Sequence, residues 1–310
     1  MQSPFEQFMM ELQDTDEHIV RSKLTNLSEL SPEEIGIFRS QWSDIDAERR
    51  RQIVGQLAEL AGENLELDFD EVLRACLADP DAETRTNAIE GLWDCEDSKI
   101  LDQLIVLLLE DSVTSVRASA ACALRKFALL AELGKLSQGD AARVEKALLA
   151  AWNNKKEQLE VCRRTLEAIS SLSKPVVIDL IRQAYNSDNL ELQISALYAM
   201  GQNCDPGWLP ILLQELRSPH AEMRFEAARA CGELESEEAI PSLIEAITDL
   251  DLQVRTSAIE ALGKIGGNSA KEALRRCLTN HDELSQEAAK EALGELLFLE
   301  DPLSLNMEDY

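Results

Sequence analysis

Aspartate and arginine stand six residues apart at four places in this chain. The pairs are Asp44 with Arg50, Asp79 with Arg85, Asp111 with Arg117, and Asp249 with Arg255. Carboxylates beside guanidinium groups could form an active site, or they could hold turns by accepting from helix-start amides and from the arginine. Because the pairs recur along the chain instead of converging on one place, we predict a structural ladder. In each rung the aspartate of a turn would bind the arginine six residues later.

The two members of the pair also disappear together. At three further positions both are replaced, giving Lys156 with Cys162, Ser187 with Gln193, and Asn280 with Gln286. Only Ser218 with Arg224 departs from this rule. Residues that are lost together are most simply partners, which supports the ladder.

Other residue types offer no catalytic motif. The seven cysteines are scattered without a CxxC spacing, at Cys76, Cys95, Cys122, Cys162, Cys204, Cys231 and Cys277. The three histidines, His18, His220 and His281, form no HExxH motif, and no phosphate-binding loop or GxSxG motif occurs. An odd number of scattered cysteines is typical of a reducing compartment. We therefore expect no catalytic residue, no metal and no cofactor.

The elements that carry these residues repeat every 31 residues between positions 162 and 293. One column of the alignment contains Thr165, Ala196, Ala227, Ala258 and Ala289, and another contains Ile169, Met200, Cys231, Leu262 and Leu293. Looser copies occupy residues 116–125, 84–93 and 49–58, with a weaker one near 20–29. A fixed period of this length is typical of stacked helical or β repeats that bury their apolar faces against each other.

Each repeat is predicted to form two helices. Apolar residues recur at three- and four-residue spacing from 238 to 248, and again from 254 to 265 after a turn at 249–251. Ser3-Pro4 and Ser31-Pro32, each followed by glutamate, predict capped helix starts. Recurring glycines, at Gly201, Gly232, Gly263 and Gly294, are expected at helix ends in the left-handed conformation. The predicted fold is all-α, an α-α superhelix (α-solenoid) of about nine helix pairs.

Two segments carry a resemblance to a known family. Residues 223–232 (MRFEAARACG) and 254–263 (VRTSAIEALG) resemble HEAT repeats, of the short kind named after phycobilisome lyases. The resemblance is close from about 190 to 294 and loose before 60. It implies a HEAT-like solenoid and is nearly silent on activity, since relatives include scaffolds, adaptors, chaperone-like factors, bilin lyases, a hydroxylase and DNA-repair glycosylases. The paired His-Glu iron motifs of the hydroxylase are absent from this sequence.

The chain is strongly acidic, with 58 acidic and 30 basic residues and a net charge of −28. This charge repels polyanions, so we expect no nucleic-acid partner. Two explanations of the acidity remain open, namely solubility and a basic partner. No apolar run approaches the roughly 18 residues of a membrane span, and no targeting signal is visible, so a cytoplasmic location without membrane association is expected.

We predict a single domain over residues 1–300. It comprises loosely matching repeats at 1–60, an irregular insertion at about 127–144 and regular repeats at about 156–294. Gly134 and Gly139 indicate loops in the insertion, which is either a tolerated surface insertion or a binding element. Residues 301–310 form an acidic tail that is expected to be disordered.

The resemblance implies that the second helix of each repeat lines a concave groove. Two outward-facing columns are then apolar, aromatic or basic in the middle of the chain and acidic toward its end. The candidate binding residues are Arg163, Ile194, Tyr198, Phe225, Arg229, Glu260 and Glu291. Aromatic and arginine anchors are typical of interface hot spots. Alternatively, the aromatic side chains pack between helices. Trp93, at a position where other repeats have glycine, is a weaker candidate.

The leading hypothesis is a scaffold or adaptor without catalysis that binds a protein or peptide in this groove, with a basic partner as the sharper version. The alternative, which rests on the resemblance alone, is a bilin lyase or isomerase, or its chaperone-like subunit. A third hypothesis, a nucleic-acid repair enzyme, requires duplex binding despite the charge of −28. The sequence leaves the oligomeric state open.

Overall fold

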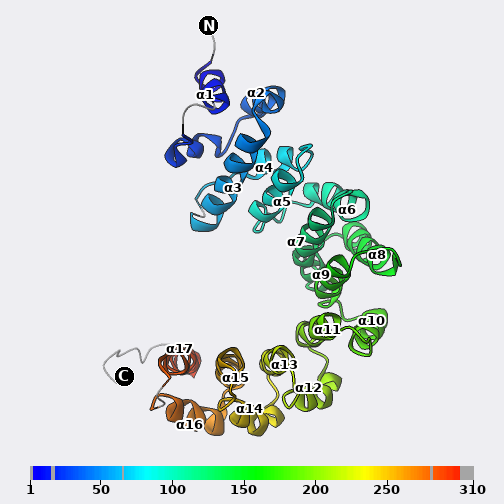
Figure 1. Cartoon of the computed structure of the whole chain (residues 1–310), viewed down its shortest axis with the longest axis vertical. Helices are drawn as coiled ribbons and strands as arrows, with labels where there is room; N and C mark the ends of the chain where they lie inside the picture. The colour runs from blue at the N-terminus through cyan, green and yellow to red at the C-terminus, as the bar shows by residue number, and fades with distance from the viewer. Residues whose placement is uncertain (1–2, 15–17, 65, 280–281, 301–310) are drawn as a thin grey trace. The chain divides into compact units, whose positions relative to one another are not determined.

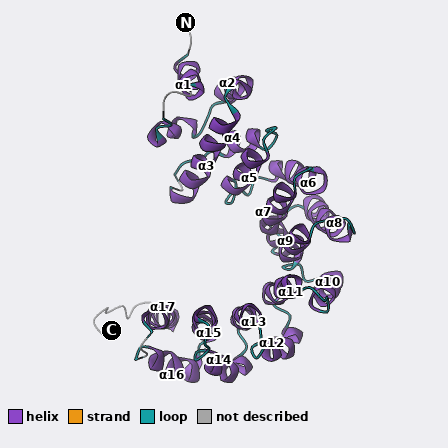
Figure 2. Ribbon diagram, in the orientation of Figure 1, coloured by secondary structure: helices purple, strands orange, loops and turns teal. Residues whose placement is uncertain are grey.

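The protein is built from α-helices joined by short turns (Figures 1 and 2). The computed structural model describes residues 3–14, 18–64, 66–279 and 282–300. No strand occurs among these residues. The predicted all-α repeat fold is therefore confirmed. The chain divides into two compact parts, residues 1–168 and residues 169–310, which we call the N-terminal part and the C-terminal part.

The N-terminal part contains eight complete α-helices and nearly all of a ninth. They are α1 (Pro4–Gln13), α2 (Pro32–Gln41), α3 (Ala47–Glu63), α4 (Asp70–Cys76), α5 (Ala82–Gly91), α6 (Leu101–Glu110), α7 (Thr114–Glu132), α8 (Gln138–Asn153) and α9 (Leu159–Ile169). A 3-10 helix, Arg21–Leu27, follows α1. Together α1 and this segment stand where the weakest predicted repeat was placed, ahead of the pairs α2/α3 to α8/α9.

The C-terminal part contains four helix pairs. They are formed by α10 (Pro175–Tyr185), α11 (Leu190–Asn203), α12 (Leu209–Glu215), α13 (Ala221–Glu233), α14 (Ile240–Ala246), α15 (Leu252–Ile265), α16 (Gly267–Cys277) and α17 (Glu283–Glu300). The second helices α11, α13, α15 and α17 pack side by side in one layer, and the first helices lie in another (Figure 1). Buried residues such as Leu197, Leu243 and Leu262 fill the core between the layers.

The helix starts in the N-terminal part follow the predicted capping chemistry. The Ser3 and Ser31 side chains accept from the amides of Glu6 and Glu34, and each glutamate accepts from the serine amide in return. Both capping boxes are therefore confirmed. The apolar face of α1 is buried, and Arg49 of α3 donates to the carbonyl of Leu12 at 2.6 Å.

The recurring glycines have a different role from the predicted one. Gly201, Gly232 and Gly263 lie inside α11, α13 and α15, and none has a positive φ. A Cβ atom on Gly232 would lie 2.9 Å from the Ala261 Cα atom of the next second helix, and Gly201 faces Ala230 at the same distance. Glycine is needed because neighbouring second helices approach too closely for a side chain. The prediction of left-handed helix ends is wrong for these three residues and for Gly294, which lies inside α17 without a positive φ.

The irregular segment at 127–144 is divided between two helices. The second helix α7 continues to Glu132 and ends at Gly134, whose φ is +68°. Helix α8 then begins after Ser137, whose side chain accepts from the amide of Asp140. Gly139 lies within α8, so the loop predicted there is wrong.

Candidate functional site

The Asp–Arg ladder exists, but its rungs join successive repeats. Arg224 donates from Nε and Nη2 to the two carboxylate oxygens of Asp249, 25 residues later, at 2.7 and 2.8 Å. Its Nη1 donates to the carbonyl of Ser218 in its own repeat at 2.9 Å. Arg255 likewise donates to the Asp249 carbonyl at 2.8 Å and to the Asp282 carboxylate at 2.9 Å.

The same arrangement runs through the N-terminal part. Three arginines bind the acidic side chain of the following repeat, in the pairs Arg50–Asp79, Arg85–Asp111 and Arg117–Glu157, with closest distances of 2.9, 2.8 and 2.7 Å. Arg85 and Arg117 also bind the carbonyls of Asp79 and Asp111, six residues earlier. The prediction that each carboxylate pairs with the arginine of its own repeat is therefore wrong. Asp44 makes no ion pair in the part of the chain that the structure describes.

Pairing between repeats explains the departure at Ser218 and Arg224. Arg224 needs only the carbonyl of Ser218 in its own repeat, so no aspartate is required there. Ser218 lacks a carboxylate because the preceding repeat has Gln193 in place of arginine, and Ser187 lacks one because Cys162 precedes it. Glu157 accepts from Arg117 although it lies one position beyond the expected column. A column read at fixed spacing misses this residue.

The carboxylates of the ladder are held in their ionised form by the arginines that they bind. The Arg224 guanidinium holds the pKa of Asp249 below its usual range. Burial alone would raise the pKa of Glu157, but hydrogen bonds from Arg117 and the Gln158 amide bring it below its usual range. Carboxylates held ionised by arginine are poor general acids. The geometry supports the structural interpretation.

A partly exposed aromatic and basic surface lies on α11 and α13. Ile194 and Tyr198 are one helical turn apart on α11, and Phe225 and Arg229 are one turn apart on α13. The Arg229 guanidinium lies 4.6 Å from the centre of the Tyr198 ring, so the two faces are adjacent. All four side chains are partly exposed. We call these four residues the α11–α13 patch.

The other predicted binding residues are placed differently. Glu260 on α15 and Glu291 on α17 are exposed on the next second helices of the C-terminal part. Arg163 belongs to α9 of the N-terminal part, where it donates to Glu160 at 3.3 Å. The structure therefore brings Ile194, Tyr198, Phe225 and Arg229 together.

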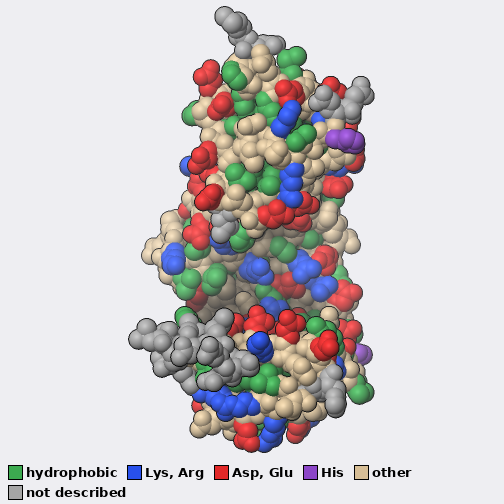
Figure 3. Space-filling model, turned by 90° about the vertical axis from the view of Figure 1, so that its left-hand side faces the viewer, with side chains coloured by type: hydrophobic (Ala, Val, Ile, Leu, Met, Phe, Trp, Pro, Cys, Tyr) green, Lys and Arg blue, Asp and Glu red, His purple; other side chains and the backbone are tan. Residues whose placement is uncertain are grey.

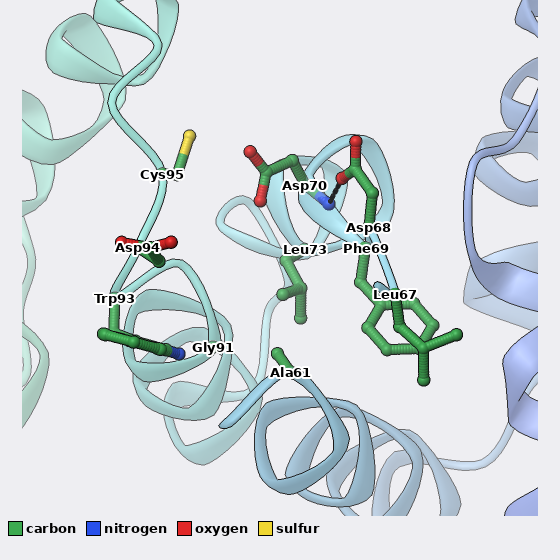
Figure 4. A pocket seen from close by; sticks show the side chains of 10 residues that line it. All are labelled: Ala61, Leu67, Asp68, Phe69, Asp70, Leu73, Gly91, Trp93, Asp94 and Cys95. Carbon is green, nitrogen blue, oxygen red and sulfur yellow. Dashed lines mark hydrogen bonds between the residues drawn. The ribbon is translucent and has the colours of Figure 1, made fainter. Parts of the chain in front are cut away.

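One pocket was not predicted from the sequence as a site. It has a volume of about 170 Å³ in the N-terminal part, between the start of α4 and the turn after α5 (Figure 4). Its lining comprises Ala61, Leu67, Asp68, Phe69, Asp70, Leu73, Gly91, Trp93, Asp94 and Cys95. Trp93 is 53% exposed. The place of Trp93 in the repeat was the only sequence signal. Asp94 follows Trp93 in the same turn, whereas Asp70 is the first residue of α4 and Asp68 lies just before it.

The surface charge, the geometry of possible metal ligands and the apolarity of the helices were each compared with what a binding site or a membrane span requires. On the face shown in Figure 3, acidic side chains lie among apolar ones, and Lys and Arg side chains gather only in small groups. Within the described residues, no group of three or more His, Cys, Asp or Glu side chains has the geometry of a metal site. No described helix is long and apolar enough to cross a membrane.

Comparisons with known proteins agree on the repeat. A family model described as HEAT repeats matches residues 209–294. No curated protein sequence matches this chain.

Solved structures that resemble this chain include two with TM-scores above 0.5, each aligned over more than nine-tenths of the chain. The complex of CpcE and CpcF of phycocyanin lyase from Nostoc sp. PCC7120 aligns over 91% of this chain and 97% of the other, with 16% identity and a TM-score of 0.55. Yeast importin-β (Kap95p) aligns over 94% of this chain and 46% of the other, with 12% identity and a TM-score of 0.58. At these identities the similarity establishes the fold alone. Residues 209–294 therefore match HEAT repeats in sequence, and the stacked helix pairs show that the chain has the fold of a HEAT-like helical solenoid.

Proposed function

We propose that the protein is a scaffold or adaptor without catalytic activity of its own, and that it binds a protein partner through the second helices of its C-terminal part. The observation that carries this proposal is the α11–α13 patch, in which Arg229 lies over the Tyr198 ring beside Ile194 and Phe225. Partly exposed aromatic, aliphatic and arginine side chains on adjacent helices are the residue types that dominate binding energy in interfaces.

The acidic residues beyond the patch favour a partner that carries basic side chains. Glu260 and Glu291 are exposed on α15 and α17, which continue the same helix layer. A segment lying across the layer would place apolar side chains on the patch and basic side chains near these glutamates. Charge complementarity of this kind mainly raises the association rate and selects among partners.

Double truncation of Tyr198 and Phe225 to alanine tests the proposal. Each side chain should contribute about 1–3 kcal/mol to a buried interface, so the affinity should fall at least about tenfold. Leu250→Ala is the control, because Leu250 is 99% exposed in the turn before α15 and is not one of the patch residues. The partner is captured from a native extract, and its affinity for each purified variant is then measured by surface plasmon resonance.

Two other outcomes of the double truncation would contradict the proposed binding role of the patch. Unchanged affinity in the folded double variant would move the interface away from the patch. A double variant that unfolds would show that the two aromatic side chains stabilise the core. In that case Ile194→Asp on the neighbouring turn provides the second test, since a charge there weakens an apolar contact without removing a ring.

Charge reversal tests the acidic end of the surface separately. The double variant Glu260→Lys and Glu291→Lys should slow association with a basic partner and reduce the dependence of the association rate on salt. Dissociation should change little, because exposed charges at the rim contribute little once the complex has formed.

A bilin lyase or isomerase, or its chaperone-like subunit, is the second candidate. It is supported by the fold shared with the CpcE–CpcF complex, which is described as a phycocyanin lyase. Absorption and fluorescence titration of the purified protein with a free bilin tests it. A tight spectral shift, or transfer of the bilin to an acceptor protein, would favour this function over the scaffold.

A further inference from the structure

Two side chains that border the pocket between α4 and α5, those of Trp93 and Asp70, are available to bind a ligand. The Trp93 ring borders the opening from the turn after α5, and the Asp70 side chain borders it from the start of α4 (Figure 4). The indole nitrogen of Trp93 has no hydrogen-bond partner in the described chain, and half of the residue is exposed to solvent. An exposed tryptophan beside a cavity offers a large flat surface for a ligand.

Asp70 differs from the carboxylates of the ladder. Asp79, Asp111 and Glu157 each bind an arginine, whereas Asp70 makes no ion pair within the described residues. Its one side-chain partner is the thiol of Cys95, which donates to the carboxylate. Burial raises the pKa of Asp70, so the ionised side chain is poorly compensated where it stands.

The other charged side chains near the pocket already have hydrogen-bond or ion-pair partners. The Arg74 guanidinium, one turn after Asp70, is held by Glu71 and lies 3.9 Å from Asp97. The Asp94 carboxylate and carbonyl both accept from Lys126. The Asp68 carboxylate accepts from the Asp70 amide at 2.9 Å, as Figure 4 shows. Among the described residues, Asp70 is thus the pocket carboxylate without an ion pair or a backbone donor, and Arg74 makes only the smallest contribution to its pKa.

A planar cation satisfies both unused groups at once. A guanidinium can lie flat on the indole ring through a cation–π contact and donate its N–H groups to one carboxylate. The apolar side chains of Leu67 and Leu73 also line the pocket and can contact the methylene groups of the same residue. An arginine head group fits a volume of about 170 Å³, whereas a folded domain does not.

We propose that this pocket binds an arginine side chain of the protein partner, with the guanidinium between the Trp93 ring and the Asp70 carboxylate. The inference rests on the proposed scaffold function, and it adds a second contact, in the N-terminal part, with a defined chemistry. The acidity of the chain is then used for recognition at this site.

The test uses Nα-acetyl-arginine amide as the probe and the full-length protein. The indole N–H signals of the four tryptophans are followed by NMR, with the Trp93 signal assigned from Trp93→Phe. The probe should shift the Trp93 signal and leave those of Trp42 and Trp208 unchanged, because both are buried elsewhere. Binding should weaken at least tenfold in Asp70→Asn and in Trp93→Leu. It should be unchanged in Glu66→Gln, which removes an exposed charge nearby.

Three further probes, one neutral and two cationic, test which chemical group the pocket recognises. Nα-acetyl-citrulline amide has the shape of the arginine probe without its charge, and it should not bind. Equal binding of citrulline, or equal weakening by Asp70→Asn and Glu66→Gln, would overturn the proposal. Tighter binding of Nα-acetyl-lysine amide or of spermidine would overturn the assignment to arginine and indicate a different amine as ligand.

Stability separates a ligand contact from a structural role of Asp70. Because the pKa of Asp70 is raised by burial, Asp70→Asn should leave the melting temperature unchanged or raise it while binding is lost. A fall in melting temperature with unchanged probe binding would show that Asp70 only stabilises α4. The probe experiment needs no partner, so its failure leaves the α11–α13 patch untouched. Failure of the Tyr198 and Phe225 truncation likewise leaves this pocket untouched.

Discussion

At the scale of single residues, the arginine that opens a second helix makes two kinds of contact. In Arg224, Nη1 holds the carbonyl of its own turn, while Nε and Nη2 bind the carboxylate of the next repeat. A planar guanidinium suits this task because its donors point in fixed directions, whereas lysine offers a single ammonium group. The turn in one repeat and the turn in the next are therefore held by one side chain.

Double-mutant cycles test the direction of the rungs. Asp249→Ala removes the acceptor of Arg224 and of the Asp251 amide, and should lower the free energy of unfolding by about 1–3 kcal/mol. The coupling between Asp249→Ala and Arg224→Ala should be on the order of 1 kcal/mol, and that between Asp249→Ala and Arg255→Ala much smaller. Urea denaturation measures both. A larger coupling to Arg255 would restore pairing within one repeat.

A second ion pair beside the ladder, Arg51 with the helix-capping Asp81, predicts a pH dependence of stability. Hydrogen bonds from Arg51 and Thr84 lower the pKa of Asp81 to about 2, and the usual value in an unfolded chain is about 3.9. A depressed carboxyl pKa stabilises the fold above the unfolded pKa, and this stabilisation is lost as the pH falls through the folded pKa. In Arg51→Gln, the loss of stability between pH 4 and pH 2 should be smaller than in the wild type. Urea denaturation at pH 4, 3 and 2 measures it, and parallel curves would contradict the assignment.

At the scale of helices, the spacing of the second-helix layer depends on glycine. Gly263 faces Ala292 of α17, where a Cβ atom added to the glycine would lie only 2.8 Å from the alanine Cβ, and Gly232 faces the backbone of α15. Backbone atoms cannot move aside as a flexible side chain can. The glycines therefore let second helices pack closely in the C-terminal part.

Two glycine substitutions separate close packing from helix propensity. Gly232→Ala should lower the free energy of unfolding by about 1–3 kcal/mol, because its new methyl group would overlap α15. Gly294→Ala is the matched control in α17, where nothing lies within 4 Å, and it should raise stability by up to about 1 kcal/mol through helix propensity. Thermal denaturation distinguishes the two. A destabilised Gly294→Ala would mean that α17 has a neighbour at that position.

At the scale of the whole molecule, the net charge of −28 means that the excess carboxylates repel one another and destabilise the folded state. Local pairs such as Arg50–Asp79 are shielded from solvent, since their side chains are 8% and 0% exposed, whereas the excess carboxylates lie on the surface. Salt therefore screens the long-range repulsion more than it weakens the buried pairs.

The melting temperature should accordingly rise when NaCl increases from 10 to 150 mM. The Debye length falls from about 30 Å to about 8 Å over this range, which removes most repulsion between distant carboxylates. Differential scanning calorimetry at several salt concentrations measures the effect, with sucrose of equal osmolality as the control. A fall in melting temperature would show that exposed ion pairs, such as Arg217–Glu245, outweigh the repulsion.

Periodicity was sufficient to predict helix pairs, but it could not give their contacts. Asp249 lies six residues before Arg255 and 25 after Arg224, and the sequence offers both arginines as partners. Only the folded chain shows which guanidinium reaches the carboxylate. Gly232 was ambiguous for the same reason, since a helix end and a close helix contact both favour glycine. The pocket at Trp93 and Asp70 joins two helices whose side chains share no sequence spacing.

Pairing between repeats gives their order a physical meaning. A repeat that carries the arginine must be followed by one that carries an acid, while Gln193 can be followed by the neutral Ser218. Inserting the repeat of Asp249 directly after that of Gln193 would leave a largely buried carboxylate without its guanidinium. Duplication, deletion or shuffling of repeats in such a chain is thus limited by a rule of adjacency. An engineer who recombines these repeats should match each junction before optimising any single repeat.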